Sequence, residues 1–547
     1  MSIRSGVADR LWFAALVVVV VGAAGRPNRS QTHSSPPDID RAPPAGACPS
    51  GGATAEPQAG DWNGWGRGPA NSRYQPQPGL TPGDVRRLKV KWAFAYDGKN
   101  PRGQPTVVGG RVYVANAGRV YALNAKTGCT YWTYASEGGV RTAISIGRLP
   151  RESPAESAAY FGDDRAVVHA VDARAGTLLW KTKIEDARGA LITGSPTLYN
   201  NRLYVPVSSN EEGLASWIKN YECCKFRGSI VALDAATGAV VWKTYTIAEA
   251  PKPFKKSADG VELYGPAGAS VWSAPTIDVD RRLLYVGTGN SYTDVPTSAS
   301  DAILAIEIDS GRIAWISQQT SHDNYVMNCP TPGVRNCPEV LGEDFDFGSS
   351  PILHTLPTGR TVILAGQKSG ALYALDPNRG GALLWKIRLT SGGFLGGIEW
   401  GPAADRDNVY VAISDVTARD GAPGLYAVAV ATGERIWTTP APTPACSWGV
   451  AGCSHAQSQA VTVIPGIAFS GSIDGHLRAY STNDGAVVWD FDTARAYDTV
   501  TGGQANGGSL DAGGPAVVDG VLYVNSGYSL IAGRSGNVLL AFSVDGK

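Results

Sequence analysis

The sequence predicts an all-β protein folded as an eight-bladed β-propeller. Three observations predict this fold: short apolar alternations, abundant turn residues and a recurring tryptophan. The chain of 547 residues contains 67 Gly, 35 Pro and 15 Trp, and strongly helical segments are scarce. Short strands joined by tight turns account for that usage, and a recurring internal repeat is typical of propellers.

One pattern recurs seven times. An alternating apolar strand leads to a polar residue and a turn with Gly, and a second strand then ends in Trp; VYALNAKTGCTYW and IVALDAATGAVVW are examples. Alternation places side chains on opposite faces of a strand, Gly accepts the positive φ of a tight turn, and the large Trp ring can wedge between neighbouring sheets. The seven tryptophans are Trp132, Trp180, Trp242, Trp315, Trp385, Trp437 and Trp489.

Two incomplete copies stand at the ends of the repeat region. Trp92 in LKVKWAFAY has the strand that follows the turn but no turn before it, whereas VLLAFSVDG near the C-terminus has the strand and turn but no Trp. We therefore expect the N-terminal strand to join the C-terminal hairpin and to close a ring of eight four-stranded blades. The unequal Trp spacings indicate long insertions in some blades, which we expect to be functional.

Composition narrows the possible partners. The chain has 48 basic and 48 acidic side chains, so no net charge attracts nucleic acid or an anionic membrane as the main partner. Hydrophobic residues make up 43% of the chain, which excludes a disordered protein.

The N-terminus has the composition of a secretory signal. Arg4 and Arg10 precede an apolar run over 11–21 and small residues at 22–25, which predicts a signal peptide over 1–25. A membrane anchor is the alternative, although the run is short for a span of about 20 residues. Either way we expect a periplasmic or secreted protein, with a flexible lead over 26–60 and the propeller over 61–547.

The eight cysteines favour disulfides, because their number is even and the chain is predicted to be exported. Cys223 and Cys224 are adjacent and either form a vicinal disulfide or remain buried thiols. No CxxCH sequence occurs, so the signature of covalent haem is absent, and no CxxC or HExxH suggests zinc. Spacing and elimination suggest three further pairs: Cys329–Cys337, Cys446–Cys453 and Cys48–Cys129.

The repeats resemble a known motif. The units from Asn124 to Trp132 and from Asp234 to Trp242 resemble the tryptophan-docking motif of the pyrroloquinoline quinone (PQQ) dependent alcohol dehydrogenases. Non-enzymatic envelope propellers carry similar blades, so a scaffold or binding propeller is the alternative. A sugar-oxidising quinoprotein is less consistent with eight Trp repeats. The insertions favour the alcohol dehydrogenases, because several resemble the family's site segments.

In GASVWSAP, Trp272 matches the family Trp that forms the floor under the quinone. In GTGN, Asn290 matches an Asn that ligates calcium. A flat quinone needs an aromatic plane, and a hard cation needs oxygen donors. Ordinary core packing of Trp272 and a left-handed turn at Asn290 are the alternatives.

Asp323 in QQTSHDNY resembles the family's catalytic aspartate, which takes the alcohol proton and could also ligate calcium. The family continues with a Trp-Asp pair at this point. This chain instead has Tyr325, an insertion bounded by cysteines, and then Asp344-Phe-Asp346, a departure that could reshape the substrate entrance. Lanthanide-dependent relatives place an Asp where Tyr325 stands, so the resemblance favours calcium.

The remaining expected site residues also rest on the resemblance. Lys368 matches a Lys or Arg that donates to the quinone oxygens and stabilises the quinol, Arg141 matches an Arg near the quinone carboxylates, and Trp400 is a further expected cofactor contact. Cys223–Cys224 is expected against the other face of PQQ, although the family's vicinal pair lies in an earlier blade. For the calcium-binding glutamate, Glu222 is preferred because it precedes an Arg-Gly strand start, with Glu212 in reserve.

Several segments are similar to the polyvinyl-alcohol dehydrogenases of this family, among them DWNGWGRGPANSRYQP and TSHDNYVMNCP. The resemblance implies oxidation of an alcohol or hydroxylated polymer with PQQ and Ca²⁺, and a natural secondary alcohol fits equally well. Because the family's haem segment is absent from this sequence, electrons are expected to pass to an external acceptor such as a cytochrome c.

Overall fold

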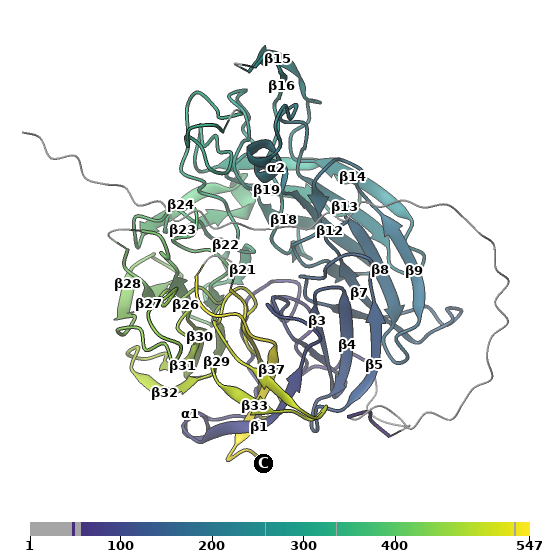
Figure 1. The fold of residues 1–547 in the computed structure, drawn as a ribbon, viewed down its shortest axis with the longest axis vertical. Helices are drawn as coiled ribbons and strands as arrows, with labels where there is room; N and C mark the ends of the chain where they lie inside the picture. Colours follow the sequence, from purple (N-terminus) through teal and green to yellow (C-terminus); the bar gives the residue numbers. More distant parts are fainter. Residues whose placement is uncertain (1–45, 50–55, 258, 335, 419–420, 530–531) are drawn as a thin grey trace, which may run out of the picture. The chain divides into compact units, whose positions relative to one another are not determined.

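Alternating apolar residues form the short strands that the sequence predicts, and these strands assemble into eight antiparallel sheets around a common axis (Figure 1). The computed structural model describes residues 46–49, 56–257, 259–334, 336–418, 421–529 and 532–547. The predicted signal peptide, 1–25, and most of the predicted lead, 26–60, lie outside the described residues. No helix among the described residues is long and apolar enough to cross a membrane.

Blades 1 to 4 follow one another along the chain. Their strands are β2 (Thr106–Val108), β3 (Arg111–Asn116), β4 (Arg119–Asn124) and β5 (Thr130–Ala135) in blade 1; β6 (Ser145–Arg148), β7 (Ser157–Gly162), β8 (Val167–Asp172) and β9 (Leu178–Lys183) in blade 2; β10 (Ala190–Leu191), β11 (Thr197–Tyr199), β12 (Arg202–Ser209), β13 (Ser229–Asp234) and β14 (Val240–Tyr245) in blade 3; and β17 (Thr276–Asp278), β18 (Leu283–Gly287), β19 (Ala302–Glu307) and β20 (Ile313–Gln318) in blade 4.

Blades 5 to 8 complete the ring. Their strands are β21 (Ile352–Thr355), β22 (Thr361–Gly366), β23 (Ala371–Asp376) and β24 (Ala382–Arg388) in blade 5; β25 (Ala403–Ala404), β26 (Asn408–Ile413), β27 (Gly424–Ala429) and β28 (Arg435–Pro440) in blade 6; β29 (Thr462–Ile464), β30 (Ile467–Gly471), β31 (His476–Ser481) and β32 (Val487–Asp492) in blade 7; and β35 (Ala516–Val518), β36 (Val521–Ser526), β37 (Val538–Val544) and β1 (Leu88–Ala95) in blade 8.

The ring is closed as the sequence predicts. The N-terminal strand β1 pairs antiparallel with the C-terminal strand β37, from Leu88 opposite Val544 to Ala95 opposite Val538. The innermost strands of neighbouring blades touch one another, as β17 touches β21 and β2 touches β35. The eight-bladed propeller with joined ends is therefore confirmed.

The repeated tryptophans hold neighbouring blades together. Trp242, for example, donates its indole N–H to the carbonyl of Ile308 in the next blade at 3.1 Å, and its ring lies against Gly311, whose φ is 74°. Seven of the eight repeat tryptophans make the equivalent bond, at 3.0 to 3.2 Å. The exception is Trp315, whose Nε1 has no partner among the described residues. The facing turn begins with Pro377 and folds as a 3₁₀ helix, η1 (Pro377–Arg379), so the usual acceptor geometry is lost.

A segment that the repeat does not predict fills the propeller axis. Residues 62–75 run along the innermost strands and exchange backbone hydrogen bonds with five blades, for example at Val107, Ile277, Leu353, Ala404 and Val463. Arg73 is buried within this segment, where its guanidinium lies over the rings of Trp62 and Trp65. It donates to three carbonyl or amide oxygens of Val461, Trp65 and Gln104 at 2.6 to 3.0 Å, so each nitrogen of the buried guanidinium has a hydrogen-bond acceptor.

Insertions in blades 3 and 4 form a lobe that projects from the ring (Figure 1). The lobe contains helix α2 (Glu211–Trp217), the hairpin of β15 (Lys252–Lys256) and β16 (Glu262–Gly265), and the loop over 320–345. Smaller additions are helix α1 (Pro82–Val85) and the hairpin of β33 (Ala496–Asp498) and β34 (Gln504–Asn506). All four suggested disulfides are present: Cys48–Cys129, Cys223–Cys224, Cys329–Cys337 and Cys446–Cys453.

The docking turns predict a specific loss of stability. Gly311 and Gly359 both have positive φ, but a Cβ at 311 would lie 2.6 Å from Cδ2 of Trp242, whereas a Cβ at 359 would meet nothing within 4 Å. Gly359→Ala should lower the free energy of unfolding by about 1 kcal/mol through its backbone conformation, and Gly311→Ala by about 1 to 3 kcal/mol more through overpacking. Urea unfolding midpoints of the two variants test this, and equal midpoints would contradict it.

Candidate functional site

A cavity of about 510 Å³ opens at the propeller axis, a volume within the usual range for ligand sites. Its wall contains six of the residues expected from the sequence: Arg141, Glu212, Trp272, Asn290, Lys368 and Trp400. They come from two kinds of loop, those that enter the first strand of a blade and those that join its second and third strands. Because the strands are antiparallel, both kinds of loop lie at the same end of the sheets.

The cavity has an aromatic and cationic wall. Trp272 meets Trp400 edge-to-face, with ring centroids 5.6 Å apart, and the Arg141 guanidinium lies 4.5 Å from the Trp400 ring centroid. Gly348 allows this arrangement, because a Cβ there would lie 2.0 Å from Cη2 of Trp272. Arg141 has no ion-pair partner within the described part of the chain, and burial lowers the pKa of its guanidinium. An anionic ligand would therefore find a partly buried cation available for pairing.

Lys368 follows strand β22 and stands between two carboxylates. Its Nζ lies 3.0 Å from Asp344 and 3.3 Å from Asp346, and 5.2 Å from the Trp272 ring centroid. Burial alone would lower the pKa of Lys368, but Asp344 and Asp346 outweigh burial and raise it well above the usual value. The amine is therefore charged at neutral pH.

Asp346 lies at the centre of this arrangement, although the sequence analysis did not select it as a site residue. It lines the cavity and accepts hydrogen bonds from the Asn290 backbone N–H at 2.7 Å and from the Trp272 indole at 3.0 Å, besides its contact with Lys368. The signal in the sequence was the pair Asp344-Phe-Asp346, which follows the insertion bounded by Cys329 and Cys337. That insertion displaces these acids along the chain but leaves Asp346 beside Asn290.

Asp323 lies in a second layer. It is 2% exposed and does not line the cavity. Its carboxylate accepts the backbone N–H groups of Asp344 and Phe345 at 3.0 and 2.6 Å. Burial raises the pKa of Asp323, while these hydrogen bonds oppose the rise. Its visible role is to hold the loop that presents Asp346.

The two candidate glutamates differ in position. Glu212, on α2, lines the cavity; burial raises its pKa to about 7, Asp346 adds to the rise and Lys368 opposes it. Glu222 is 56% exposed and pairs with Lys225 at 2.5 Å on the protein surface. As a candidate metal ligand, Glu212 is therefore better placed than Glu222, which the sequence analysis preferred.

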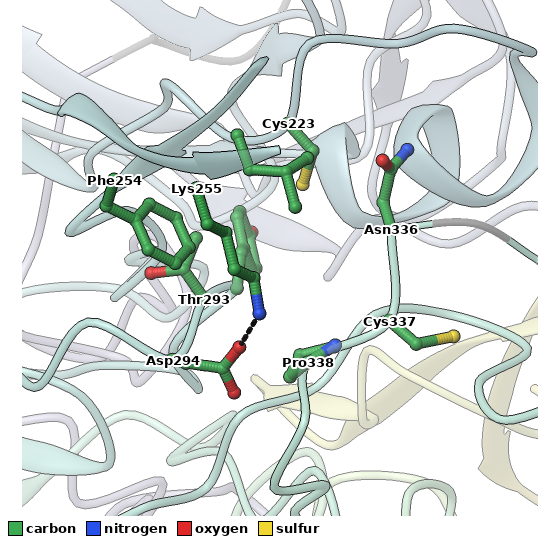
Figure 2. A pocket seen from close by; sticks show the side chains of 10 residues that line it. Cys223, Phe254, Lys255, Thr293, Asp294, Asn336, Cys337 and Pro338 are labelled. Atoms are coloured by element: carbon green, nitrogen blue, oxygen red, sulfur yellow. Dashed lines mark hydrogen bonds and ion pairs between the residues drawn. The ribbon is translucent and has the colours of Figure 1, made fainter. Parts of the chain in front are cut away.

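The vicinal disulfide does not reach the central cavity. Cys223 and Cys224 are buried among apolar side chains that include Tyr292. Cys223 lines a separate pocket, shown in Figure 2, with Phe254, the Lys255–Asp294 ion pair and Asn336. That pocket encloses only about 10 Å³, scarcely enough for one water molecule. Tyr292 lines both spaces, so the disulfide supports the cavity wall from behind it.

Asp301, just before β19, is a second carboxylate that the sequence analysis missed. It is fully buried, and neither oxygen has a hydrogen-bond partner in the described residues. Burial, followed by the charges of Asp323, Asp346 and Asp344, raises its pKa well above the usual value. Asp301 does not line the cavity, but its interactions with Asp323, Asp344 and Asp346 show that acidic groups gather behind the wall at Asp346, which favours a cation bound nearby.

These features fit PQQ and an oxygen-seeking metal ion. The cavity offers an aromatic plane, the buried cation Lys368 and the partly buried cation Arg141 to a flat polyanion. It offers the oxygens of Asn290, Glu212 and Asp346 to a cation. Across the ranges that the structure describes, no group of three or more His, Cys, Asp or Glu side chains is arranged to hold a metal ion. Two carboxylates and an amide would therefore leave part of the coordination to the cofactor or water.

Known proteins are similar to this chain in both sequence and fold. The family described as glucose/ethanol/alcohol dehydrogenase, β-propeller domain, matches residues 62–391, and the family of the outer membrane protein assembly factor BamB matches residues 368–547. The polyvinylalcohol dehydrogenase of Pseudomonas sp. is 52% identical over 497 residues, which cover 89% of this chain and 77% of that protein. The enzyme of the same name from Sphingopyxis sp. is 46% identical, with the same coverage.

Among solved structures, the quinohemoprotein alcohol dehydrogenase ADH-IIG of Pseudomonas putida has a TM-score of 0.66 at 18% identity, covering 89% of this chain and 81% of that one. This likeness establishes the fold. The matched propeller and the extensive identity to two relatives establish that the chain belongs to the PQQ-dependent alcohol dehydrogenase family.

Proposed function

We propose that this protein oxidises secondary hydroxyl groups, those of polyvinyl alcohol or a similar hydroxylated polymer, with PQQ as the bound oxidant. The observation that supports this most is the position of Asp346, which stands in one cavity with Trp272, Asn290 and Lys368. The two polyvinylalcohol dehydrogenases, at 52% and 46% identity, suggest the substrate class. Electrons leave to an external acceptor, such as a cytochrome c.

The chain's own residues would hold the cofactor in a defined orientation. Trp272 supplies a flat apolar surface for stacking, Arg141 pairs with a carboxylate, and Lys368 donates to quinone oxygens. When bound, PQQ supplies the redox chemistry by accepting hydride from the carbinol carbon. The fixed charge of Lys368 is already in place to stabilise the negative charge that develops on reduction.

Oxygen ligands in this cavity suit calcium. Ca²⁺ takes six to eight oxygen ligands, and Asn290, Glu212 and Asp346 provide side-chain oxygens on one wall of the cavity. The cation would offset the acidic excess created by Asp301, Asp323 and Asp344. It would also polarise a quinone carbonyl.

Asp346 is the best-placed general base. It lines the cavity, whereas Asp323 is enclosed by the loop at Gly342 and its hydrogen bonds to Asp344 and Phe345. Asp346 would take the hydroxyl proton, while Lys368 and the indole of Trp272 hold its carboxylate in place. Asp323 positions the loop and does not touch the substrate in this mechanism.

The four disulfides support a location outside the cytoplasm, because disulfides persist in oxidising compartments. A periplasmic or secreted protein would meet both a polymeric alcohol and a soluble electron carrier.

Cofactor binding separates an enzyme from a scaffold. Chelator-treated protein titrated with PQQ in a calorimeter should bind one PQQ per chain, and Ca²⁺ should tighten binding by about tenfold or more, ~1.4 kcal/mol. The loaded protein should then oxidise secondary alcohols with an artificial dye as acceptor. If no heat of binding is seen with or without Ca²⁺, the chain is a scaffold propeller.

Two aspartate variants distinguish the base from the positioning residue. Asp346→Asn should lower kcat with a secondary alcohol by about 10²- to 10⁴-fold, because the base is lost. Asp323→Asn should retain measurable turnover but lower the melting temperature, because one of its two loop hydrogen bonds loses its acceptor. Steady-state kinetics and thermal melting check this. An active Asp346→Asn protein beside an inactive Asp323→Asn protein would restore Asp323 as the base.

The glutamates provide a matched pair of metal-site variants. Glu212→Gln should weaken Ca²⁺-dependent PQQ binding by about tenfold or more, ~1.4 kcal/mol, because a charged ligand becomes neutral. Glu222→Gln should leave it unchanged, because Glu222 pairs with Lys225 at the surface. Calorimetric titrations with Ca²⁺ check the difference, and the reverse order of effects would return the ligand role to Glu222.

A further inference from the structure

The mouth of the central cavity has an exposed tryptophan. Trp217 is 55% exposed, more than any exposed Phe of the described chain, yet it also lines the cavity that contains Lys368 and Asp346. At that exposure, more than half of the apolar surface of the residue remains in contact with water and contributes nothing to the stability of the fold. Exposed aromatic surface that continues into a ligand cavity is typical of a binding site.

The ring is held in a fixed position. It lies back along its own helix over Gly213, where a Cβ would stand 3.0 Å from Trp217 Cη2. Helix α2 is anchored at its start by Glu211, which accepts the backbone N–H groups of Lys225 and Phe226 at 2.7 to 3.0 Å. The same helix carries Glu212 into the cavity, so Trp217 and the reaction centre belong to one rigid element.

The loop closed by Cys329–Cys337 fixes the far end of the helix. Asn328 donates to Ser216 at 2.9 Å, and Asn336 donates to the Ala215 carbonyl at 2.8 Å. Met327, next to Asn328, lines the same cavity as Trp217. Thus the lobe presents two large apolar side chains, Trp217 and Met327, to whatever enters the cavity.

Other parts of the cavity wall are polar. Asn100, Arg102, Asn116 and Asp164 line it, and none of them belongs to the lobe. A long ligand that enters the cavity past Trp217 would contact both apolar side chains and hydrogen-bonding groups. A hydrocarbon chain with a hydroxyl group on every second carbon has both kinds of surface along its whole length, whereas a small alcohol that has reached the reaction centre no longer extends to the mouth.

We propose that Trp217 and Met327 form a rim subsite that binds the carbon backbone of a hydroxylated polymer next to its reacting unit. This inference rests on the proposed function and adds to it the residues that select a polymer over a small alcohol. Binding at the rim holds neighbouring units of the chain while one carbinol enters the cavity. Such remote contacts act on kcat/KM for the long substrate alone.

The test compares polyvinyl alcohol with 2-pentanol on protein loaded with PQQ and Ca²⁺. Trp217→Ala should lower kcat/KM for the polymer by about tenfold, mainly through KM, and should change kcat/KM for 2-pentanol by less than about twofold. Met327→Ala should show a smaller loss in the same direction. Phe254→Ala is the matched control, because Phe254 is an exposed aromatic of the same lobe, 38% exposed, that lines only the small pocket; it should leave both substrates unaffected.

PQQ titration of each variant shows whether α2 still places Glu212 correctly, and Trp217→Phe should recover most of the polymer activity. Equal losses on both substrates, or no loss on either, would overturn the rim subsite while the proposed function stands. If the loaded wild-type protein oxidises neither substrate, the proposed function is wrong and the rim subsite is overturned with it.

Discussion

The antiparallel pairing of β1 with β37 is the constraint on which the rest of the structure depends. Blades interact mainly with their immediate neighbours, so an open row of blades would have two free edges and no axial cavity. Closure brings together loops that lie far apart in the chain, from Arg141 in blade 2 to Trp400 at blade 6. The docking tryptophans then fix the distance between blades, because all eight except Trp315 bridge two sheets through both the ring and the indole N–H.

The segment over 62–75 completes the axis in a way that no single blade could. It forms backbone hydrogen bonds with the innermost strands of five blades. The buried guanidinium of Arg73 also needs Val461 and Gln104, at the starts of blades 7 and 1, as hydrogen-bond acceptors. Gly401, the neighbour of Trp400, lies near this segment, because a Cβ there would stand 3.9 Å from Cδ of Arg73 and 4.0 Å from Cζ2 of Trp65. The segment therefore supports the wall of the cavity as well as joining blades, and a local reading of its Gly- and Asn-rich sequence cannot reveal either contact.

Sequence periodicity could predict the blades, their number and the closure, because each depends on short-range alternation and on a turn repeated with little change. The family resemblance, not periodicity, selected Trp272, Asn290 and Lys368, and these residues line the cavity because their loops leave the blades directly. The sequence does not predict which side chains of the lobe line the cavity. There, contacts between insertions decide which side chain faces the cavity. Glu212 and not Glu222 lies on the wall because Glu211 anchors α2 to the backbone at 225–226, and Asp346 is presented because Asp323 holds its loop.

Asp301 shows that this part of the molecule departs from what stability alone would favour. In all eight blades the residue before the third strand accepts a backbone N–H from the residue that follows the outer strand, at 2.8 to 3.0 Å. The other seven positions are Gly118, Ala166, Gly228, Gly370, Pro423, Gly475 and Asn537. The turn therefore needs no carboxylate, and a buried, unpartnered carboxyl group destabilises a fold. Among these eight positions an ionisable side chain occurs only at Asp301, in the blade that also contributes Asn290, where burial and the charges of Asp323, Asp346 and Asp344 raise its pKa. The proposed cation beside Asn290 would offset these acidic groups, whereas a propeller that served only as a scaffold would not need them.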